Sequence, residues 1–361
     1  MKVLILNTII FNNNGMAFVI KDYYDAMDKT DLDIDFVTTK EPSDEFKEWF
    51  KQNNARYYVI KKSNPLKYVM ELRKLAKREK YDLVHIHGNS ANMAFELLGC
   101  KLGGIKRRLT HVHNTTTDHP VMHRLLYPLF SALYTDALAC GQDAGKWLYR
   151  GKPFVELKNG RDVNKYAYNA DKAAKVRAEL GLADKTVIGH IGGFHRQKNH
   201  DFLIDICKSV SDMRPETAFL LLGDGVLRSE VEQKAKTLGV YDKIIFTGPV
   251  SNTEDYIQAM DAAVLPSLFE GLPLVAIEWQ INGVPCLFAD TITPQSNLTG
   301  LIDFMSLDEG SEKWAEKLLA IADNSDKAAN AAMAVPIIRE AGFDINTEAR
   351  KLRDIYFERS L

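Results

Sequence analysis

The chain alternates short apolar runs with longer segments of helical periodicity along most of its length. Unbroken runs of Val, Ile, Leu and Phe are typical of strands that a parallel sheet buries on both faces. We predict such strands at 2–6, 34–38, 82–87, 107–112 and 136–140, and again at 186–191, 217–222, 243–246, 261–265 and 284–289. Helices between them would make each half a doubly wound, mainly parallel α/β sheet.

Length and composition agree with two such domains. The chain has 361 residues, of which 46% are hydrophobic and 26% charged, as in ordinary globular proteins. The turn at Asn159-Gly160 favours a boundary near Lys158 to Asp162. We therefore expect one domain over 1–160 and another over 161–343, followed by a last helix over 346–357.

The cysteines and the first residues indicate a cytoplasmic protein. The four cysteines are far apart and form no Cys-x-x-Cys pair; they are Cys100, Cys140, Cys207 and Cys286. The start Met1-Lys-Val-Leu-Ile-Leu6 is typical of a first strand and not of a signal peptide. We expect a reducing compartment, no structural zinc and, without a nucleic-acid motif, no nucleic-acid partner.

Two carboxylates flank a Gly-Leu-Pro turn in Glu270-Gly271-Leu272-Pro273-Leu274, with Glu278 eight positions after the first. The turn follows the predicted strand 261–265 and would open a helix over 273–281, with Pro273 at its first position. A helix N-terminus suits a phosphate group, and ionised Glu accepts from the hydroxyls of a sugar or ribose. The pattern indicates a nucleotide-sugar site, although a capped helix with a solvent-facing Glu would look the same.

Three further predicted strands end in glycine turns, at Gly192-Gly193, at Gly223-Asp-Gly225 and at Gly248. Small residues let the backbone approach a ligand, and Arg196 and Lys198 bring positive charge to the first of these turns. The carboxyl ends of parallel strands meet at one edge, where open α/β sheets bind ligands. These turns therefore extend the predicted site.

Together these segments resemble the donor domain of glycosyltransferase family 4, retaining enzymes with the GT-B fold. In the first half the resemblance rests on the following segments: Lys2–Leu6 with Asn14-Gly15, Arg108–Asn114, Ala139–Leu148 and Lys158–Gly160. Within the family the chain looks most like bacterial transferases for capsular or exopolysaccharide repeat units. The resemblance implies two Rossmann-like domains facing a cleft. The first would bind acceptor, the second the donor, and a C-terminal helix at about 344–361 would return to the first.

The resemblance also implies an activity: metal-independent, retaining transfer of a hexose from a nucleotide sugar, most often a UDP-sugar, to a saccharide or lipid-linked saccharide in surface polysaccharide synthesis. His113 would contact the transferred sugar, Glu270 its hydroxyls and Glu278 the ribose. Lys198, Arg196 and the Gly271-Leu272 helix end would balance the diphosphate. The remaining implied donor-binding residues are Asn14, Gly15, Gly192, Gly193, Gly248, Pro273 and Leu274. Front-face attack, with the donor phosphate taking the acceptor proton, would need no protein base.

Two positions depart from the family pattern. Asn14-Gly15 replaces the usual Gly pair, and Gly193 replaces an arginine that contacts the diphosphate. Arg196, three residues on, is our candidate to compensate. The departures keep two alternatives open: a non-catalytic GT-B subunit that supports a partner transferase, and a GT-B sugar-nucleotide epimerase.

The charge distribution bears on membrane binding. Residues 1–160 contain 24 Lys+Arg and 18 Asp+Glu, a net charge of +6, and the remainder contains 22 and 30, a net charge of −8. Within 61–80, apolar residues at helical spacing would be buried and leave the basic residues on the opposite face; they are Leu66, Val69, Leu72 and Ala76. Either a solvated face or peripheral attachment to an anionic membrane fits this pattern. The apolar run 125–134 is too short to span a bilayer and reads as a core helix or an interfacial anchor.

Two His-x-His pairs, His85 with His87 and His111 with His113, invite a metal-site interpretation. Members of each pair share one face of a strand. However, Asp82 would face the other side, no cysteine lies beside either pair, and the resemblance implies a metal-free enzyme. We therefore expect no metal.

Overall fold

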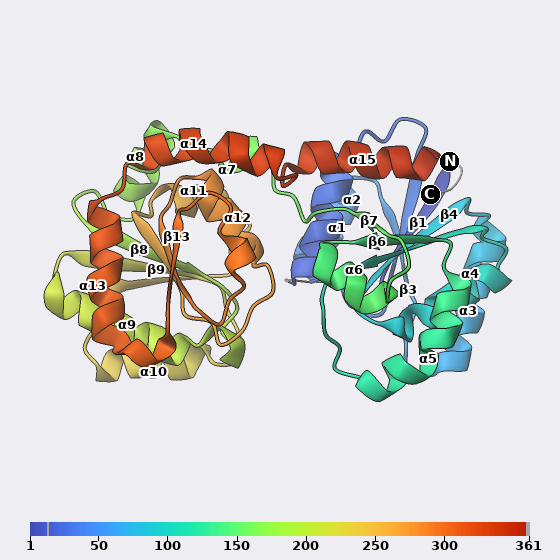
Figure 1. Ribbon diagram of the computed structural model, residues 1–361, viewed down its shortest axis with the longest axis horizontal. Coiled ribbons are helices and arrows are strands. Elements are labelled where there is room, and N and C mark those ends of the chain that lie inside the picture. Colours follow the sequence, from blue (N-terminus) through green and yellow to red (C-terminus); the bar gives the residue numbers. More distant parts are fainter. Residues whose placement is uncertain (13, 359–361) are drawn as a thin grey trace. The chain divides into compact units, whose positions relative to one another are not determined.

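The computed structural model describes residues 1–12 and 14–358 and divides into two compact units. The first unit comprises Met1–Gly160 and Ile345–Leu361, and the second comprises Arg161–Asp344. Each unit is a parallel sheet with helices on both faces (Figure 1). This is the doubly wound α/β class that the apolar runs predicted.

The first unit contains a seven-stranded sheet in the order β3-β2-β1-β4-β5-β6-β7. Its strands are β1 (Lys2–Asn7), β2 (Asp33–Thr38), β3 (Arg56–Val59), β4 (Leu83–Gly88), β5 (Arg107–Val112), β6 (Asp136–Ala139) and β7 (Val155–Glu156). Its helices are α1 (Gly15–Ala26), α2 (Asp44–Gln52), α3 (Pro65–Glu79), η1 (Ala91–Met93), α4 (Ala94–Leu102), α5 (Pro120–Leu133), α6 (Gln142–Tyr149) and α15 (Ile345–Phe357). The strand order reverses between β1 and β4, which places a switch point there.

The second unit contains a six-stranded sheet in the order β10-β9-β8-β11-β12-β13. Its strands are β8 (Thr186–Ile191), β9 (Thr217–Leu222), β10 (Ile244–Gly248), β11 (Ala262–Leu265), β12 (Cys286–Ala289) and β13 (Ile302–Met305). Its helices are α7 (Val163–Tyr166), α8 (Ala170–Glu179), η2 (Arg196–Lys198), α9 (His200–Met213), α10 (Arg228–Thr237), η3 (Tyr241–Lys243), α11 (Thr253–Gln258), α12 (Leu274–Ile281), η4 (Pro294–Ser296), η5 (Leu307–Glu309), α13 (Gly310–Asp323) and α14 (Lys327–Glu340). Here the switch point lies between β8 and β11.

All ten predicted strands are present, with ends shifted by at most two residues. Three strands escaped prediction: β3, β7 and β13. Each is short and lies at or next to the edge of its sheet, where burial on both faces is not required. Their sequences therefore lack the apolar run that identified the others.

Helix α15 completes the first unit. It packs against α1, and its Tyr356 hydroxyl lies 2.7 Å from Nδ1 of His85 in β4. Arg107 at the start of β5 donates to the carbonyl oxygens of Ile355 and Tyr356, at 3.0 and 2.7 Å. Helix α15, which Figure 1 shows beside α1, thus contributes buried side chains to the first unit and bonds to residues of β4 and β5.

Two helices of the first unit expose apolar side chains. In α3, Val69, Leu72 and Ala76 are buried as predicted, but Leu66 is 81% exposed. The prediction for Leu66 was wrong because Leu66 lies in the first turn of α3, before the buried part of the helix, which begins at Tyr68; the Tyr68 hydroxyl donates to Glu96 of α4. In α5, Phe130 and Leu133 are buried, whereas four residues face solvent: Val121, Met122, Leu125 and Leu129. Among the described residues, no helix has the length and apolar character needed to cross a bilayer.

Candidate functional site

At the switch point of the second unit, the turn after β8 is joined to the loop after β11. The amide of Leu268 donates to the carbonyl of Gln197 at 2.8 Å, and the Gln197 side chain returns a bond to the carbonyl of Phe269 at 3.0 Å. Asn199 donates from Nδ2 to the carbonyl of Pro266 at 3.1 Å. These bonds hold the 196–199 turn against the 266–270 loop, so two predicted segments form one surface.

Lys198 and Glu270 meet on that surface. The Lys198 ammonium lies 2.6 Å from Glu270 Oε1, which also accepts from the Ser267 hydroxyl at 3.1 Å. The Lys198 stem crosses Gly192, where a β-carbon would lie 3.0 Å from Lys198 Cε. Gly192 therefore leaves room for the lysine to reach the carboxylate.

The glycine turns after β8, β9 and β10 interlock. Gly223 has φ of 128°, and a β-carbon there would lie 2.2 Å from the carbonyl oxygen of Gly192. The amide of Gly223 donates to the carbonyl of Gly248 at 3.0 Å, and Gly248 has φ of 72°. These close backbone approaches require glycine and bring the ends of the three strands together.

The ring of His195 lies over Gly193, the position where the family pattern has arginine. A β-carbon at Gly193 would come within 2.9 Å of His195 Cδ2. Arg196, the residue expected to compensate, begins the short helix η2 and is exposed. The imidazole of His195 therefore lies beside Gly193, where the family pattern has an arginine. No feature of the sequence indicates this contact.

Helix α12, which carries Glu278, begins one residue later than predicted. Pro273 is the N-cap of α12, with φ of −68° and ψ of 126°, and Leu274 is the first helical residue. The assignment of Pro273 to the first helical position was wrong, because its ψ is extended. Gly271 is exposed and Leu272 is partly buried in the turn before the helix.

Glu278 lies within α12 and is 7% exposed. Its Oε1 lies 2.8 Å from Nε of Arg161, which is also buried. Arg161 directly follows the Asn159-Gly160 turn and lies 117 positions before Glu278, so no local sequence pattern predicts this pair. A buried carboxylate held by a guanidinium has a fixed orientation, which suits a binding residue.

The other predicted site residues belong to the first unit. Asn14 is the N-cap of α1 and accepts from the Ala17 amide at 3.0 Å, and Gly15 is the first residue of that helix. His113 follows β5, and its Nε2 lies 2.9 Å from Nδ1 of His87. Burial lowers the pKa of His113 to about 4, against an opposing effect of the Asn159 side chain. His113 is therefore a neutral imidazole at physiological pH.

The first unit also has a pocket of about 420 Å³ near the carboxyl ends of β1, β4 and β5. Hydroxyl and amide groups line it beside apolar and charged side chains; they include Thr8, Asn89, Asn92, Asn114, Thr117, Lys62, Asp118, Tyr68, Phe95 and Met122. In the sequence, Asn114 stands out only as the end of the Arg108–Asn114 segment. The other polar residues lie in several loops far apart in the sequence, so the sequence does not predict that they line one cavity.

Two doubly wound units, the second with a glycine-rich edge and a Lys-Glu pair beside a helix N-terminus, are the architecture of the GT-B fold. Residues 13–145 match the model of Glycosyltransferase Family 4, and residues 185–324 match that of Glycosyl transferases group 1. The chain belongs to glycosyltransferase family 4.

Individual relatives agree with this assignment. The putative glycosyltransferase EpsF of Bacillus subtilis is 32% identical over 85% of this chain and 84% of its own length. The UDP-Gal:α-D-GlcNAc-diphosphoundecaprenol α-1,3-galactosyltransferase of Escherichia coli is 27% identical over 62% of each chain. Among solved structures, HepE of Anabaena superposes with a TM-score of 0.80 over 99% of each chain at 18% identity, a likeness of fold.

Proposed function

We propose that this chain transfers a hexose from a UDP-sugar to a lipid-linked saccharide, with retention of anomeric configuration and without a metal ion. The observation that carries the proposal is the Lys198–Glu270 pair, 2.6 Å apart on the loops that follow β8 and β11. This edge of the sheet is where doubly wound folds bind nucleotides. The donor nucleotide follows by analogy, since HepE has been solved with UDP and with UDP-glucose.

Lys198 would stabilise the departing diphosphate. Its ammonium is paired with Glu270, so a phosphate group near the start of α12 would compete with that carboxylate for the same cation. Charge develops on the diphosphate as the glycosidic bond breaks, and a positioned ammonium with a helix N-terminus would balance it. Arg196 would add a second cation from the same turn.

The carboxylates would orient the donor. Glu270 would accept from the sugar hydroxyls and Glu278, fixed by Arg161, from the ribose hydroxyls. The glycines at 192, 193 and 248, with residues 271–274, would let the donor approach the backbone. His113, Asn14 and Gly15 of the first unit would contact the donor, as the family resemblance implies.

The acceptor would bind in the first unit. The 420 Å³ pocket combines hydroxyl and amide groups with aromatic and aliphatic side chains, a mixture suited to a saccharide. A lipid-linked acceptor follows by analogy with the Escherichia coli relative, whose name describes a diphosphoundecaprenol-linked sugar. Peripheral contact with the cytoplasmic face of the membrane would involve α3 and α5, which expose Leu66, Val121 and Leu125.

Donor-panel transfer assays with mass detection test this proposal. We expect transfer from one UDP-sugar to a lipid-linked saccharide, in the presence of chelator, with a product of the donor's anomeric configuration by NMR. A supporting subunit without activity would neither bind UDP nor hydrolyse donor. An epimerase would convert the donor with no acceptor present. Either outcome would replace the proposal.

A further inference from the structure

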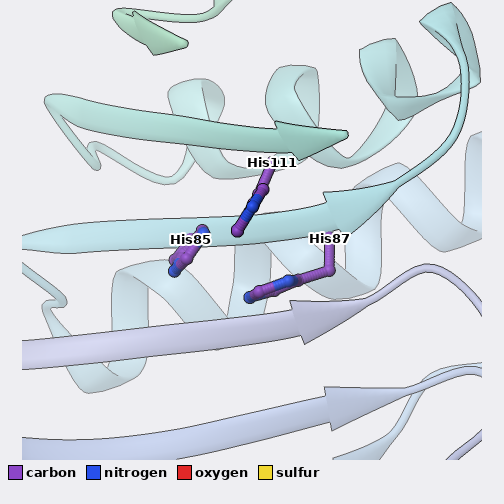
Figure 2. Close-up of side chains that lie close together, drawn as sticks. All are labelled: His85, His87 and His111. Atoms are coloured by element: carbon purple, nitrogen blue, oxygen red, sulfur yellow. The ribbon is translucent and has the colours of Figure 1, made fainter. Parts of the chain in front are cut away.

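Four histidines form a row on one face of the first unit's sheet. His85 and His87 come from β4, His111 from β5 and His113 from the residue after it. Adjacent rings in each pair have centroids 4.1 and 4.2 Å apart, and the rings of His87 and His111 are 5.2 Å apart because these residues are register partners. Figure 2 shows the rings of His85, His87 and His111 gathered on the same side of the two strands.

The hydrogen bonds of two rings leave the opposite nitrogens for another ligand. Nδ1 of His85 lies 2.7 Å from the Tyr356 hydroxyl, and Nδ1 of His87 lies 2.9 Å from Nε2 of His113. If each Nδ1 carries the proton, each Nε2 has a lone pair available. Nε2 of His85 is buried without a hydrogen-bond partner, and at His111 the backbone of Leu157 accounts for at most one of the two ring nitrogens. Buried polar atoms normally have a partner, so one nitrogen of each residue is available to a further ligand.

The chemical state and the spacing of the rings suit a metal ion. Neutral imidazole is the form of histidine that binds a metal ion. One nitrogen from each of these three residues lies within 4.8 Å of the others. With metal–nitrogen bonds of about 2.0–2.1 Å and tetrahedral angles, these nitrogens would lie about 3.4 Å apart. The ligand nitrogens would have to draw together by up to about 1.4 Å, the difference between 4.8 and 3.4 Å.

We propose that His85, His87 and His111 form a binding site for a divalent transition-metal ion of the zinc class. Imidazole nitrogen suits this class of ion and not Mg²⁺ or Ca²⁺. A cavity of about 10 Å³ borders His85, His87 and Tyr356 but not His111, and apolar and tyrosine side chains line the rest of it. A water or hydroxide completes the tetrahedral set, and hydroxide offsets part of the charge that three neutral ligands leave on the ion.

Tyr356 and His113 act as the outer partners of this site. Metal-bound histidines usually give their second ring N–H to another group, which fixes the tautomer and the ring orientation. Tyr356 would accept from His85, and His113 from His87, through the contacts already described. The ion would link β4 to β5 and, through Tyr356, to α15. Its role is structural, and no step of the proposed sugar transfer passes through it.

Metal uptake by the full chain tests the site. After chelator treatment and dialysis, we expect the wild type to bind one Zn²⁺ per chain in equilibrium dialysis and Co²⁺ with the intense visible absorption of a tetrahedral nitrogen site. His85→Gln and His111→Gln should each abolish both signals. Tyr356→Phe should weaken Zn²⁺ binding about 10- to 100-fold, the usual effect of losing an outer partner. His123→Gln is the matched control, since it removes a buried histidine of the same unit outside the row.

Two results would overturn the inference. The first is a wild type that takes up no stoichiometric Zn²⁺, or that binds Co²⁺ only with the weak spectrum of an octahedral oxygen site. The second is uptake by the folded His85→Gln and His111→Gln variants equal to that of His123→Gln. Circular dichroism establishes folding, and if the histidine variants unfold, the wild-type Co²⁺ spectrum and the Tyr356→Phe affinity decide the question.

Discussion

The ammonium of Lys198 and the carboxylate of Glu270 form an ion pair of 2.6 Å between loops that are 72 residues apart in the chain. The pair predicts separable phenotypes. Lys198→Ala should weaken UDP binding by about 1.5–3 kcal/mol, the usual range for a hydrogen bond to a charged group. Glu270→Ala should lower kcat without weakening UDP binding, because this carboxylate would meet the sugar and its removal frees the Lys198 ammonium for the phosphate.

Calorimetric titration with UDP and steady-state kinetics measure both effects. The double variant then gives the coupling between the two side chains. If Glu270→Ala loses as much UDP affinity as Lys198→Ala, the carboxylate acts on the nucleotide or only orients the lysine. The assignment of Glu270 to the sugar would then be wrong.

Glu278→Ala should weaken UDP binding by about 1.5–3 kcal/mol through loss of the ribose contact. It should also lower Tm, because Arg161 would lose a buried carboxylate partner at 2.8 Å. A ligand lacking the ribose hydroxyls separates the two effects. The wild type should prefer UDP to 2′,3′-dideoxy-UDP, and Glu278→Ala should bind the two equally. A retained preference in the variant would assign the ribose to another residue.

Arg196→Ala should reduce both the transfer rate and UDP affinity if Arg196 compensates for Gly193. Restoring the family arginine by Gly193→Arg should help little by itself, because its β-carbon would meet the His195 ring at 2.9 Å. Adding His195→Ala to Gly193→Arg should remove that obstacle and raise UDP affinity above that of the single variant. Equal transfer rates for Arg196→Ala and wild type would show that Arg196 has no part in donor binding.

Membrane binding should depend on both exposed helices of the first unit. Lys62 pairs with buried Glu96, so the basic residues to test are Lys61, Lys67, Lys74 and Lys77. Replacing these four with Ser should reduce co-sedimentation with anionic vesicles, and salt should weaken wild-type binding. The double variant Val121→Ser, Leu125→Ser should reduce the vesicle binding that remains at high salt, because these apolar side chains are exposed on α5.

Matched controls make the membrane test specific. Lys172→Ser and Lys175→Ser, on α8 of the second unit, remove exposed charge without touching α3 or α5. They should bind vesicles like the wild type. If all variants sediment equally, neither helix attaches the protein to the membrane.

Acid should destabilise the second unit through His190. Burial lowers the pKa of His190 to about 3, and its Nδ1 lies 2.9 Å from the carbonyl oxygen of Val264. In the unfolded chain His190 is protonated below about pH 6.5, whereas in the folded chain it is protonated only below about pH 3. The free energy of unfolding therefore falls as the pH drops from about 6.5 to about 3. The contribution is up to about 1.4 kcal/mol per pH unit. Urea unfolding at pH 7 and 4.5 should show a smaller acid loss for His190→Gln than for wild type, and equal losses would contradict the assignment.

The strands and the edge that carries the site were predictable because burial on both faces leaves a local record in the sequence. The apolar runs predict the ends of β8 and β11, and hence that Lys198 and Glu270 lie at the same edge of the sheet. The side-chain partners were not predictable in the same way. The pairing of Arg161 with Glu278 and the position of the His195 ring over Gly193 depend on the conformation of loops. Hydrophobic periodicity, which predicts helices and strands, does not predict loop conformation. Leu66 is the opposite case: the helical spacing of apolar residues predicted that it would be buried, but it is exposed.

Helix α15 gives the protein an unusual order of assembly during synthesis. The unit that the ribosome makes first lacks the hydroxyl partner of His85 and the carbonyl acceptors of Arg107 until the last 13-residue helix emerges. Residues 161–344 must be made in between, which at 5–20 residues per second takes about 10–40 s. The second unit, an uninterrupted segment, can finish folding within that interval. Until then the surface of α1 and the ends of β4 and β5 that α15 covers stay exposed in the nascent first unit.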